Sequence, residues 1–443
     1  MITERLLQFI WQYQYYNIHD LKTVSGDPVS IIRAGTYNSD QGPDFLNARV
    51  RMSGQVWAGN IELHLSSGDW FRHTHDADPH YSNVILHVVW SDDGIHPRGI
   101  PMLVIEDRVS VLLLDQYRQW MSGLSFIPCG NSITRVPDLI MSSWKDRLIV
   151  ERLERKSSQV FEWLAGNHYH WEEVLWWMLA RNFGLRVNAD AFEAVARSIP
   201  YTVLMRHRNQ LTQLEALLLG QARLLENPGS GNEIKIQHYK TGHDNRVYAG
   251  KAAERYEQKL IKEYAFLSRK YGLKPILLPV QFLRMRPASF PPLRLAELAM
   301  FFHRQADPLK TILHGSLNEI LAIFEIEING YWTTHYRPGR SAGGRIRGAG
   351  PSLAHSLIIN TVLPFLYAHL KHFAKRKIDF SPSEWLDQIG AEKNLITAGF
   401  EAIGMNITTA ADSQFLLELK SRYCSQWNCL DCAIGNHLLK SVR

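Results

Sequence analysis

The spacing of apolar residues changes once along this chain, and that change constrains the fold more than any other feature. Short β-branched runs fill the first part: Val29–Arg33, Ala48–Met52, Val56–Leu65, Val84–Trp90 and Met102–Glu106. Apolar and polar residues alternate within several of these runs, which is typical of half-buried strands. Helical spacing precedes them at residues 3–16 and follows them at residues 109–121. Residues 1–125 are therefore predicted to form an α/β domain.

From Leu139 onward the apolar residues recur with helical spacing instead. The expected helices are 143–164, 171–183, 190–197, 213–225, 248–271, 293–304 and several after residue 352. Residues 226–247 are rich in glycine and proline, predicting a surface loop and a place where this region could subdivide. The sequence thus predicts an α+β protein whose residues 139–443 form a large, mainly α-helical region.

Length and composition set wider bounds. A chain of 443 residues is expected to form two or three domains. Lys and Arg (49) outnumber Asp and Glu (43), which permits a polyanionic partner without requiring one. The apolar run Ser356–Leu370 is too short to span a bilayer and predicts a core helix. The start of the chain does not resemble a signal peptide, so we expect a cytoplasmic protein with no membrane contact and reduced cysteines. The oligomeric state is left open.

Acidic and histidine residues gather between Gly42 and Val89. Glu62 and His64 are two residues apart on an expected strand, so their side chains share a face, and Asp44 precedes the hairpin before it. Two carboxylates with a basic group suit hydrolysis by a divalent cation, in which the carboxylates hold Mg²⁺ or Mn²⁺ and the base orients water. Asp44, Glu62 and His64 are therefore predicted to be catalytic residues and metal ligands.

This arrangement resembles the PD-(D/E)XK nuclease superfamily over about the first 120 residues. Pro43-Asp44 and Glu62-Leu63-His64 match its motif, and Glu4 matches the glutamate on its first helix. The resemblance implies a restriction-endonuclease-like fold with a mixed sheet and a nuclease acting on DNA or RNA. The sequence departs from the pattern because His64 replaces the usual lysine and no long helix separates residues 65 and 84. An imidazole shifts the metal preference toward Zn²⁺, Mn²⁺ or Fe²⁺.

Further candidate ligands lie between these strands. His73, His75 and Asp78 could bind a metal, and the segment from Trp70 to His75 is similar to a histidine-rich segment of very-short-patch-repair-like nucleases. Alternatively, these residues cap surface loops. His87 lies within an apolar strand, and a core histidine is the favoured interpretation.

Nearly the whole chain also resembles an uncharacterised bacterial family described as domain of unknown function 2851. The matching segments are Glu4–Trp11, Gly42–Phe45, Asn60–His64, Val84–Val89, Gln213–Leu217, Arg286-Pro287, Phe290-Pro291, Tyr331-Trp332 and the terminal cysteine run. This resemblance implies no activity.

The cysteines form a second candidate metal site. Cys424, Cys429 and Cys432 follow a C-x4-C-x2-C pattern, and Cys129 is the one other cysteine. Clustered thiols in a reducing compartment suit Zn²⁺ or an iron–sulfur cluster, with Cys129 or His437 as the fourth ligand. With Cys129 as that ligand, the C-terminal cysteine run is expected to pack back against the first domain near Cys129. The layout is similar to AddB-like nucleases, in which one early cysteine and a C-terminal triplet bind a cluster. Three unligated helical cysteines are the alternative.

Arginines predict a phosphate-binding surface in the helical region. Candidate nucleic-acid contacts are Arg284, Arg286, Arg337, Arg340, Arg345 and Arg347. Trp332, His335 and Tyr336 could stack on bases. The preferred hypothesis is a metal-dependent nuclease-like phosphodiesterase. The alternatives are a catalytically degenerate nuclease fold that binds nucleic acid or protein, and a metal hydrolase acting on a small anionic substrate.

Overall fold

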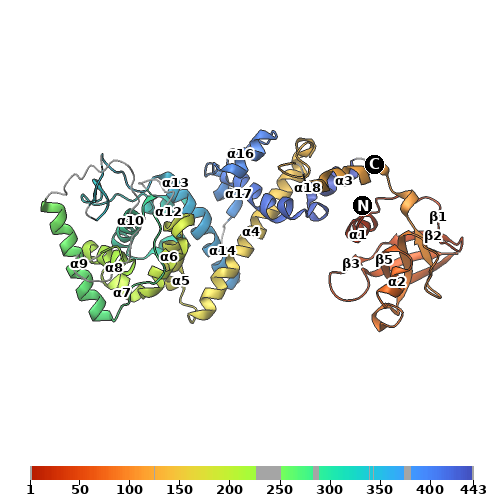
Figure 1. Cartoon of the computed structure of the whole chain (residues 1–443), viewed down its shortest axis with the longest axis horizontal. Helices are drawn as coiled ribbons and strands as arrows, with labels where there is room; N and C mark the ends of the chain where they lie inside the picture. The colour runs from red at the N-terminus through yellow and green to blue at the C-terminus, as the bar shows by residue number, and fades with distance from the viewer. Residues whose placement is uncertain are drawn as a thin grey trace. The chain divides into compact units, whose positions relative to one another are not determined.

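A computed structural model describes residues 2–123, 125–225, 251–282, 289–338, 340–342, 344–373 and 381–441. It divides into two compact units (Figure 1). Unit 1 comprises Met1–Leu148 together with Ala391–Arg443, and unit 2 comprises Ile149–Gly390. The C-terminal segment therefore belongs with the strands. The sequence suggested a division near residue 139, with the terminal cysteine run packing back near Cys129.

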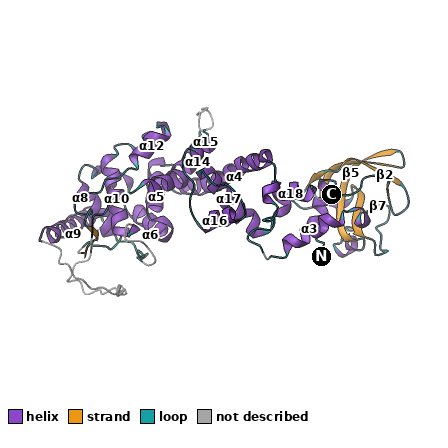
Figure 2. Cartoon of the chain, turned by 90° about the horizontal axis from the view of Figure 1, so that it is seen from above, coloured by secondary structure: helices purple, strands orange, loops and turns teal. Residues whose placement is uncertain are grey.

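Unit 1 holds the sheet, whose strands are drawn in orange in Figure 2. Its strands are β1 (Leu21–Lys22), β2 (Pro28–Arg33), β3 (Thr36–Tyr37), β4 (Phe45–Met52), β5 (Gln55–Ser66), β6 (Val84–Ser91) and β7 (Met102–Val104). Its helices are α1 (Glu4–Gln12), α2 (Asp69–Arg72), α3 (Val111–Met121), the start of α4 (Asp138–Gly166), α16 (Leu395–Ala402), α17 (Ala410–Glu418) and α18 (Ala433–Lys440). Short 3₁₀ turns are η1 (Pro79–Tyr81), η2 (Glu106–Arg108), η3 (Ile133–Arg135), η7 (Cys424–Gln426) and η8 (Cys429–Asp431), and η6 (Leu419–Tyr423) is a π-helical turn.

The sheet is mixed, as the sequence predicted. Its order is β1-β2-β4-β5-β6-β7, with β3 also paired to β4. Strands β2, β4 and β5 are antiparallel neighbours, whereas β5, β6 and β7 run parallel. Strand β6 is buried along most of its length rather than alternating, which is typical of a parallel strand covered on both faces. Gly59 permits the close approach of β5 to β6, because a Cβ there would lie 2.4 Å from Ile85 Cγ2.

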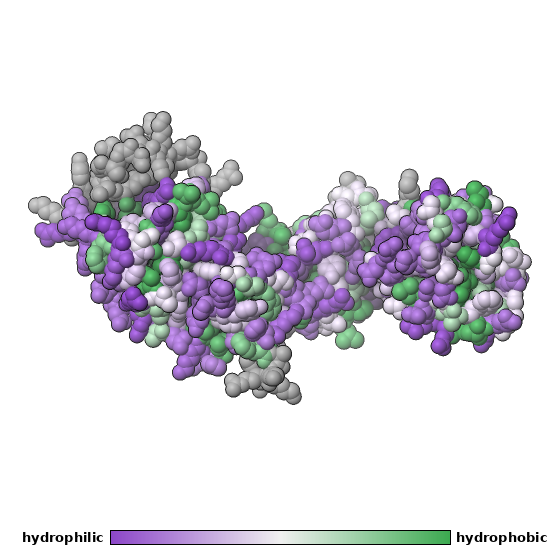
Figure 3. All heavy atoms as spheres, turned by 90° about the horizontal axis from the view of Figure 1, so that it is seen from below, coloured by the Kyte–Doolittle hydropathy of each residue, from purple (hydrophilic) through white to green (hydrophobic). Residues whose placement is uncertain are grey.

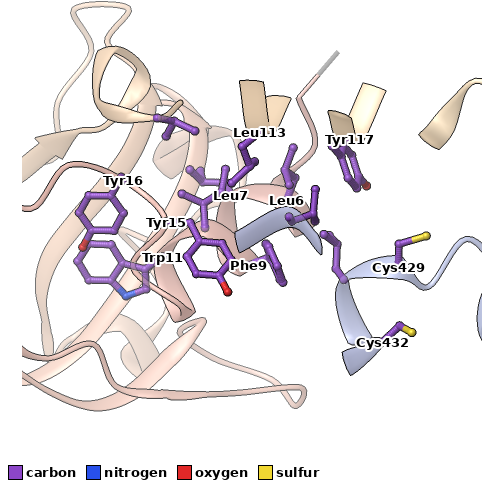
Figure 4. Packing of buried hydrophobic residues seen from close by; sticks show 14 of the residues in the cluster. Leu6, Leu7, Phe9, Trp11, Tyr15, Tyr16, Leu113, Tyr117, Cys429 and Cys432 are labelled. Carbon is purple, nitrogen blue, oxygen red and sulfur yellow. The ribbon is translucent and has the colours of Figure 1, made fainter. Parts of the chain in front are cut away.

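The first helix is shorter than its sequence pattern suggested. Thr3 caps α1 by accepting a hydrogen bond from the Leu6 N–H at 3.2 Å. The apolar face of α1 is buried and packs against β5. Helix α1 ends at Gln12, not residue 16, because Gln14 adopts a left-handed backbone conformation with φ of 51°. This turn lets Tyr15 fold back onto Phe9, with ring centroids 5.3 Å apart (Figure 4).

The core of unit 1 joins the sheet to the C-terminal segment. One cluster of buried residues contains α1, the inner sides of the strands, α3 and residues between Phe400 and Leu439. Figure 4 shows Leu6 and Leu7 of α1 near Leu113 of α3, with Cys429 and Cys432 on the neighbouring C-terminal segment. Residues distant in sequence thus share one hydrophobic core, which explains why residues 391–443 belong to this unit.

Unit 2 is mainly helical, as predicted. It contains the rest of α4, then α5 (Trp171–Phe183), α6 (Leu185–Ser198), α7 (Tyr201–Arg206), α8 (Leu211–Gln221), α9 (Lys251–Tyr271), α10 (Pro291–Arg304), α11 (Pro308–His314), α12 (Leu317–Ile323), α13 (Pro351–Leu357), α14 (Leu363–His372) and α15 (Pro382–Asp387). A π-helical turn, η5 (Ile358–Val362), joins α13 to α14, and β8 (His335–Arg337) pairs with β9 (Arg340–Ser341). The predicted loop at 226–247 lies outside the described residues, which also omit residues 248–250 of the predicted helix 248–271.

One described helical stretch of unit 2, Pro351–His372, is long and apolar enough to cross a membrane. Within its most apolar window, 67% is buried inside the structure, which is typical of a core helix. On the visible face in Figure 3, hydrophilic side chains are spread over both units, with apolar side chains in small groups between them.

Candidate metal centre

The predicted acidic and histidine residues come from neighbouring elements of unit 1. Asp44 is the residue before β4, whereas Glu62 and His64 lie on β5. Glu4 is in the first turn of α1, which packs against β5. His73 caps the C-terminal end of α2, and His75 follows it in the connection to β6. Strand pairing thus places Asp44 beside Glu62, as the sequence spacing suggested.

Hydrogen bonds hold the two carboxylates next to each other. The Asp44 backbone N–H donates to Glu62 Oε2 at 3.0 Å, and the Leu63 N–H donates to Asp44 Oδ2 at 3.0 Å. The side-chain amide of Gln8 on α1 donates to Asp44 Oδ1 at 2.7 Å. Glu62 Oε1 instead faces imidazoles: it lies 3.6 Å from His64 Nε2 and 3.4 Å from His75 Nε2.

His64 lies at the centre of the histidines. Its Nε2 is 3.1 Å from His73 Nδ1, and its Nδ1 is 2.9 Å from His87 Nε2. Ligand atoms of His64, His73 and His75 all lie within 4.8 Å of one another. His64 and His87 are fully buried, so His87 is a core histidine, and it is also the partner that orients His64. His73 is exposed and gives the cluster an open side.

Burial disfavours charge on most of these groups. Burial and the neighbouring Glu62 raise the pKa of Asp44 well above its usual range, and burial does the same to the pKa of Glu62. Burial and the surrounding histidines lower the pKa of His64 to about 2, and burial lowers the pKa of His87 to about 4. Burial also raises the pKa of Glu4, which interacts electrostatically with His73 and His75. The lowered pKa values of His64, His75 and His87 disfavour the imidazolium form that could balance the carboxylates.

A bound cation would neutralise the carboxylates of Asp44 and Glu62. Among the described residues, no lysine or arginine pairs with Asp44 or Glu62. His75 Nε2 is buried and makes no hydrogen bond with any described residue. Neutral imidazoles and carboxylate oxygens are ligands of first-row divalent metals, and the His87 contact is the type of second-shell interaction that orients a ligating histidine. The donor set of Glu62, His64, His73 and His75 therefore fits a metal ion, with Asp44 and Glu4 beside it.

The neighbouring residues have other roles. Asp78 caps η1 by accepting hydrogen bonds from the His80 N–H at 2.9 Å and the His80 ring, which matches the loop-capping alternative. Tyr81 stacks on His75 with ring centroids 3.8 Å apart and fixes that imidazole. Gln8 was not singled out from the sequence, although it lies one helical turn after Glu4 and therefore on the same face of α1.

The predicted phosphate-binding residues belong to unit 2, apart from this cluster in the chain. Arg284 and Arg286 lie outside the described residues. Arg337 is on β8 and Arg340 on β9, while Arg345 and Arg347 are exposed in the segment that follows.

The predicted base-stacking role of Trp332 and His335 is wrong. Trp332 is fully buried and its indole N–H donates to Glu215 at 3.1 Å. His335 is buried and stacks on Tyr331 with centroids 4.2 Å apart. Both side chains pack within unit 2, so neither offers a face to a base. Only Tyr336 of this group remains partly exposed.

Comparison with known proteins identifies a family, but it assigns no activity to that family. No curated protein and no solved structure matches the chain. The family model that matches residues 4–395 covers Glu4, Asp44 and the histidines, and it carries the description "Protein of unknown function (DUF2851)". The chain belongs to this family of unknown function.

Proposed function

We propose that this protein is a metal-dependent, nuclease-like phosphodiesterase that acts on DNA or RNA, with its metal centre at Glu62, His64, His73 and His75. The observation that carries the proposal is the carboxylate pair of half-buried Asp44 and buried Glu62, which faces imidazoles and no described cationic side chain. Carboxylates in this setting are costly to ionise unless a cation neutralises them.

The sheet supports the nuclease-like interpretation. An antiparallel run of β2, β4 and β5 is followed by parallel β6, with α1 packed on β5. The Asp precedes the second strand of this run, and the acid-X-His motif lies on the third. These are the positions that the resemblance to PD-(D/E)XK nucleases assigned to Asp44, Glu62 and His64.

Each residue has a role that follows from its contacts. A divalent ion at this centre would act as a Lewis acid on a phosphate ester. Glu62 and the imidazoles would hold the ion, and Asp44, fixed by Gln8 and the Leu63 N–H, would complete its acidic side. Full burial makes His64 a ligand rather than a base. Glu4 is only partly buried and has a raised pKa, so it is the residue placed to accept a proton from water.

The donor set also indicates the metal. Nitrogen ligands favour Mn²⁺, Fe²⁺ or Zn²⁺ over Mg²⁺, which prefers oxygen ligands and retains several waters. The polymeric phosphate substrate is supported by the net charge of +6 and by the exposed Arg345 and Arg347.

One observation favours a second candidate, a catalytically degenerate member of the fold that binds nucleic acid. Glu62 is 5% exposed and His64 is fully buried, so substrate would reach the centre only from the side of Glu4, Asp44 and His73. A protein that used this centre only for structure would keep the metal and lose turnover.

The test is a cleavage assay on the full chain. Metal-free protein is incubated with labelled single- and double-stranded DNA and RNA, in the presence of Mn²⁺, Zn²⁺, Fe²⁺ or Mg²⁺ in turn. Glu62→Gln removes a ligand charge with little change of shape, and Asp40→Asn removes an exposed carboxylate from the loop before Asp44 as the matched control. We expect cleavage in the wild-type and Asp40→Asn proteins and none in Glu62→Gln.

The other outcomes separate the candidates. Metal and nucleic-acid binding without cleavage would support the degenerate fold. Cleavage that persists in Glu62→Gln would exclude this centre as the active site, and cleavage of small phosphate esters alone would favour a small anionic substrate.

A further inference from the structure

The four cysteines of the chain come together at one place in unit 1. Cys129 follows α3, whereas Cys424, Cys429 and Cys432 lie between η6 and α18. All four line a single small pocket, together with Leu419, Tyr423 and Ile434 among others. Each cysteine is buried, with 6–8% of its surface exposed. None is paired in a disulfide.

We propose that Cys129, Cys424, Cys429 and Cys432 bind a four-iron, four-sulfide cluster that joins the C-terminal segment to the end of the sheet-containing part of unit 1. This inference stands independently of the nuclease proposal, because none of the four thiols belongs to the acidic and histidine centre.

The separation of the sulfurs favours a cluster over a single zinc ion. Four sulfurs around one Zn²⁺ at 2.3 Å would lie about 3.8 Å from one another. Among the described residues, which include all four cysteines, the set whose ligand atoms lie within 4.8 Å of one another consists of histidines, not cysteines. A cluster accepts more widely spaced thiols, because each sulfur binds a different iron atom. Figure 4 shows the sulfurs of Cys429 and Cys432 both directed away from the α1 side chains.

Among the described residues, the lining of this pocket includes the four thiols and no charged side chain. On cluster formation each thiol releases its proton to solvent as its sulfur bonds to one iron, so that iron replaces the proton as the neutralising charge.

The surroundings of Cys432 contain the N–H groups that an anionic cluster requires. Backbone N–H groups of Ile434 and Gly435 donate toward its sulfur. The indole N–H of Trp144 is buried without an oxygen or nitrogen acceptor among the described residues, and it also acts on the Cys432 sulfur. Hydrogen bonds from such groups stabilise cluster sulfurs and set their potential.

The backbone around the cysteines has three unusual features. Trp427, between Cys424 and Cys429, adopts a left-handed conformation with φ of 59°, which is unfavourable for a bulky residue. Gly435 approaches Cys429 so closely that a Cβ would lie 2.2 Å from the Cys429 carbonyl oxygen. The π-helical turn η6 directly precedes Cys424, and such turns occur frequently at functional sites.

Cys129, not His437, is the fourth ligand in this arrangement. The pocket is lined by Cys129, while His437 on α18 does not line it. This distinction provides a matched pair of variants, Cys129→Ser and His437→Ala. Ser425→Ala, an exposed position in the same loop, is an additional control.

The test measures iron, acid-labile sulfide and zinc in full chain purified without oxygen and then reconstituted with sulfide and equal amounts of ferrous and ferric iron. We expect about four irons and four sulfides per chain, a broad visible absorbance, and loss of both in Cys129→Ser. His437→Ala and Ser425→Ala should retain the wild-type content. Circular dichroism of the Cys129→Ser protein tests whether it still folds.

Three results would overturn the proposal: stoichiometric zinc with no iron, no metal after reconstitution, or full iron content in Cys129→Ser. If Cys129→Ser is unfolded, the iron and sulfide content of the wild-type and His437→Ala proteins still decides between a cluster and zinc, and between the two ligand sets.

Discussion

Two of the buried glutamates, one in each unit, are satisfied in different ways. In unit 2, Glu215 on α8 is 1% exposed and accepts hydrogen bonds from Asn329 at 2.6 Å, from Trp332 at 3.1 Å and from the Tyr256 hydroxyl. In unit 1, Glu62 is as deeply buried but accepts one backbone hydrogen bond, and its other oxygen faces His64 and His75.

This difference separates a structural carboxylate from a ligand. The three donors around Glu215 come from α8's neighbours and use both of its oxygens, so the group needs nothing further. The imidazoles around Glu62 present lone pairs as well as protons, and burial lowers the pKa of both His64 and His75. Burial alone therefore does not identify a functional carboxylate; the chemistry of the groups facing it does.

The largest expected effect is on metal affinity. Glu62→Gln should weaken binding of Mn²⁺ or Zn²⁺ by more than the roughly 100-fold that loss of a second-shell partner costs. Glu215→Gln should leave that affinity unchanged, since its carboxylate serves only packing in unit 2. Calorimetric titration of the metal-free proteins measures both. Equal weakening in the two variants would contradict the distinction between them.

The second-largest expected effect is a pH dependence of the stability of unit 2. Burial raises the pKa of Glu215 to about 7, above its unfolded value of 4.5, so the folded state favours the protonated form. The stabilisation is therefore fully present below pH 4.5 and is lost as the pH rises through 7, by on the order of 3 kcal/mol. Glu215→Gln should remove this pH dependence of the stability of unit 2.

Hydrogen exchange of α8 peptides across this pH range, in the full chain, follows unit 2 separately from unit 1. A pH dependence that persists in the Glu215→Gln protein would mean that another titrating group causes it. Glu297 on α10 is the nearest comparison, since its pKa is also raised to about 7, but it pairs with Arg294 at 2.6 Å.

A smaller effect should follow loss of the partner that orients His64. His87→Leu removes the nitrogen that lies 2.9 Å from His64 Nδ1, so metal affinity should fall roughly 10- to 100-fold. His87→Gln retains a hydrogen-bonding group and should recover part of that loss. Unchanged affinity in both variants would show that His64 is positioned by packing against Trp70 instead.

Much of this architecture followed from residue patterns. The helix Trp171–Phe183 and the strands around Glu62 and Asp44 were predictable because apolar spacing there is regular. The chain reversal after Gln12 was not, since it depends on a left-handed Gln14 that no local preference specifies.

The site was also predictable only in part, because several of its contacts join residues that are distant in the sequence. Two-residue spacing on β5 placed Glu62 and His64 on one face, but nothing in the sequence shows that His87 would lie beside His64 across the sheet. The network around Glu215 was missed because its donors, Asn329 and Trp332, are more than a hundred residues away. One signal was available: Glu215 is a single charged residue within an otherwise apolar helical run, Leu214–Leu219.

The smallest expected effect tests whether Glu215 is satisfied by several donors acting together. Trp332→Phe removes one hydrogen bond to Oε1 while Asn329 still donates to the same oxygen, so the lost hydrogen bond should cost unit 2 only about 1 kcal/mol, in addition to the cost of a smaller ring at a fully buried position. Asn329→Leu, which removes the donor to both Oε1 and the Tyr256 hydroxyl, should cost more. Denaturant unfolding and α8 hydrogen exchange measure the loss. A Trp332→Phe protein that loses more stability than the Asn329→Leu protein would mean that this oxygen depends on the indole alone, and Glu215 would then resemble Glu62 in having too few donors rather than contrast with it.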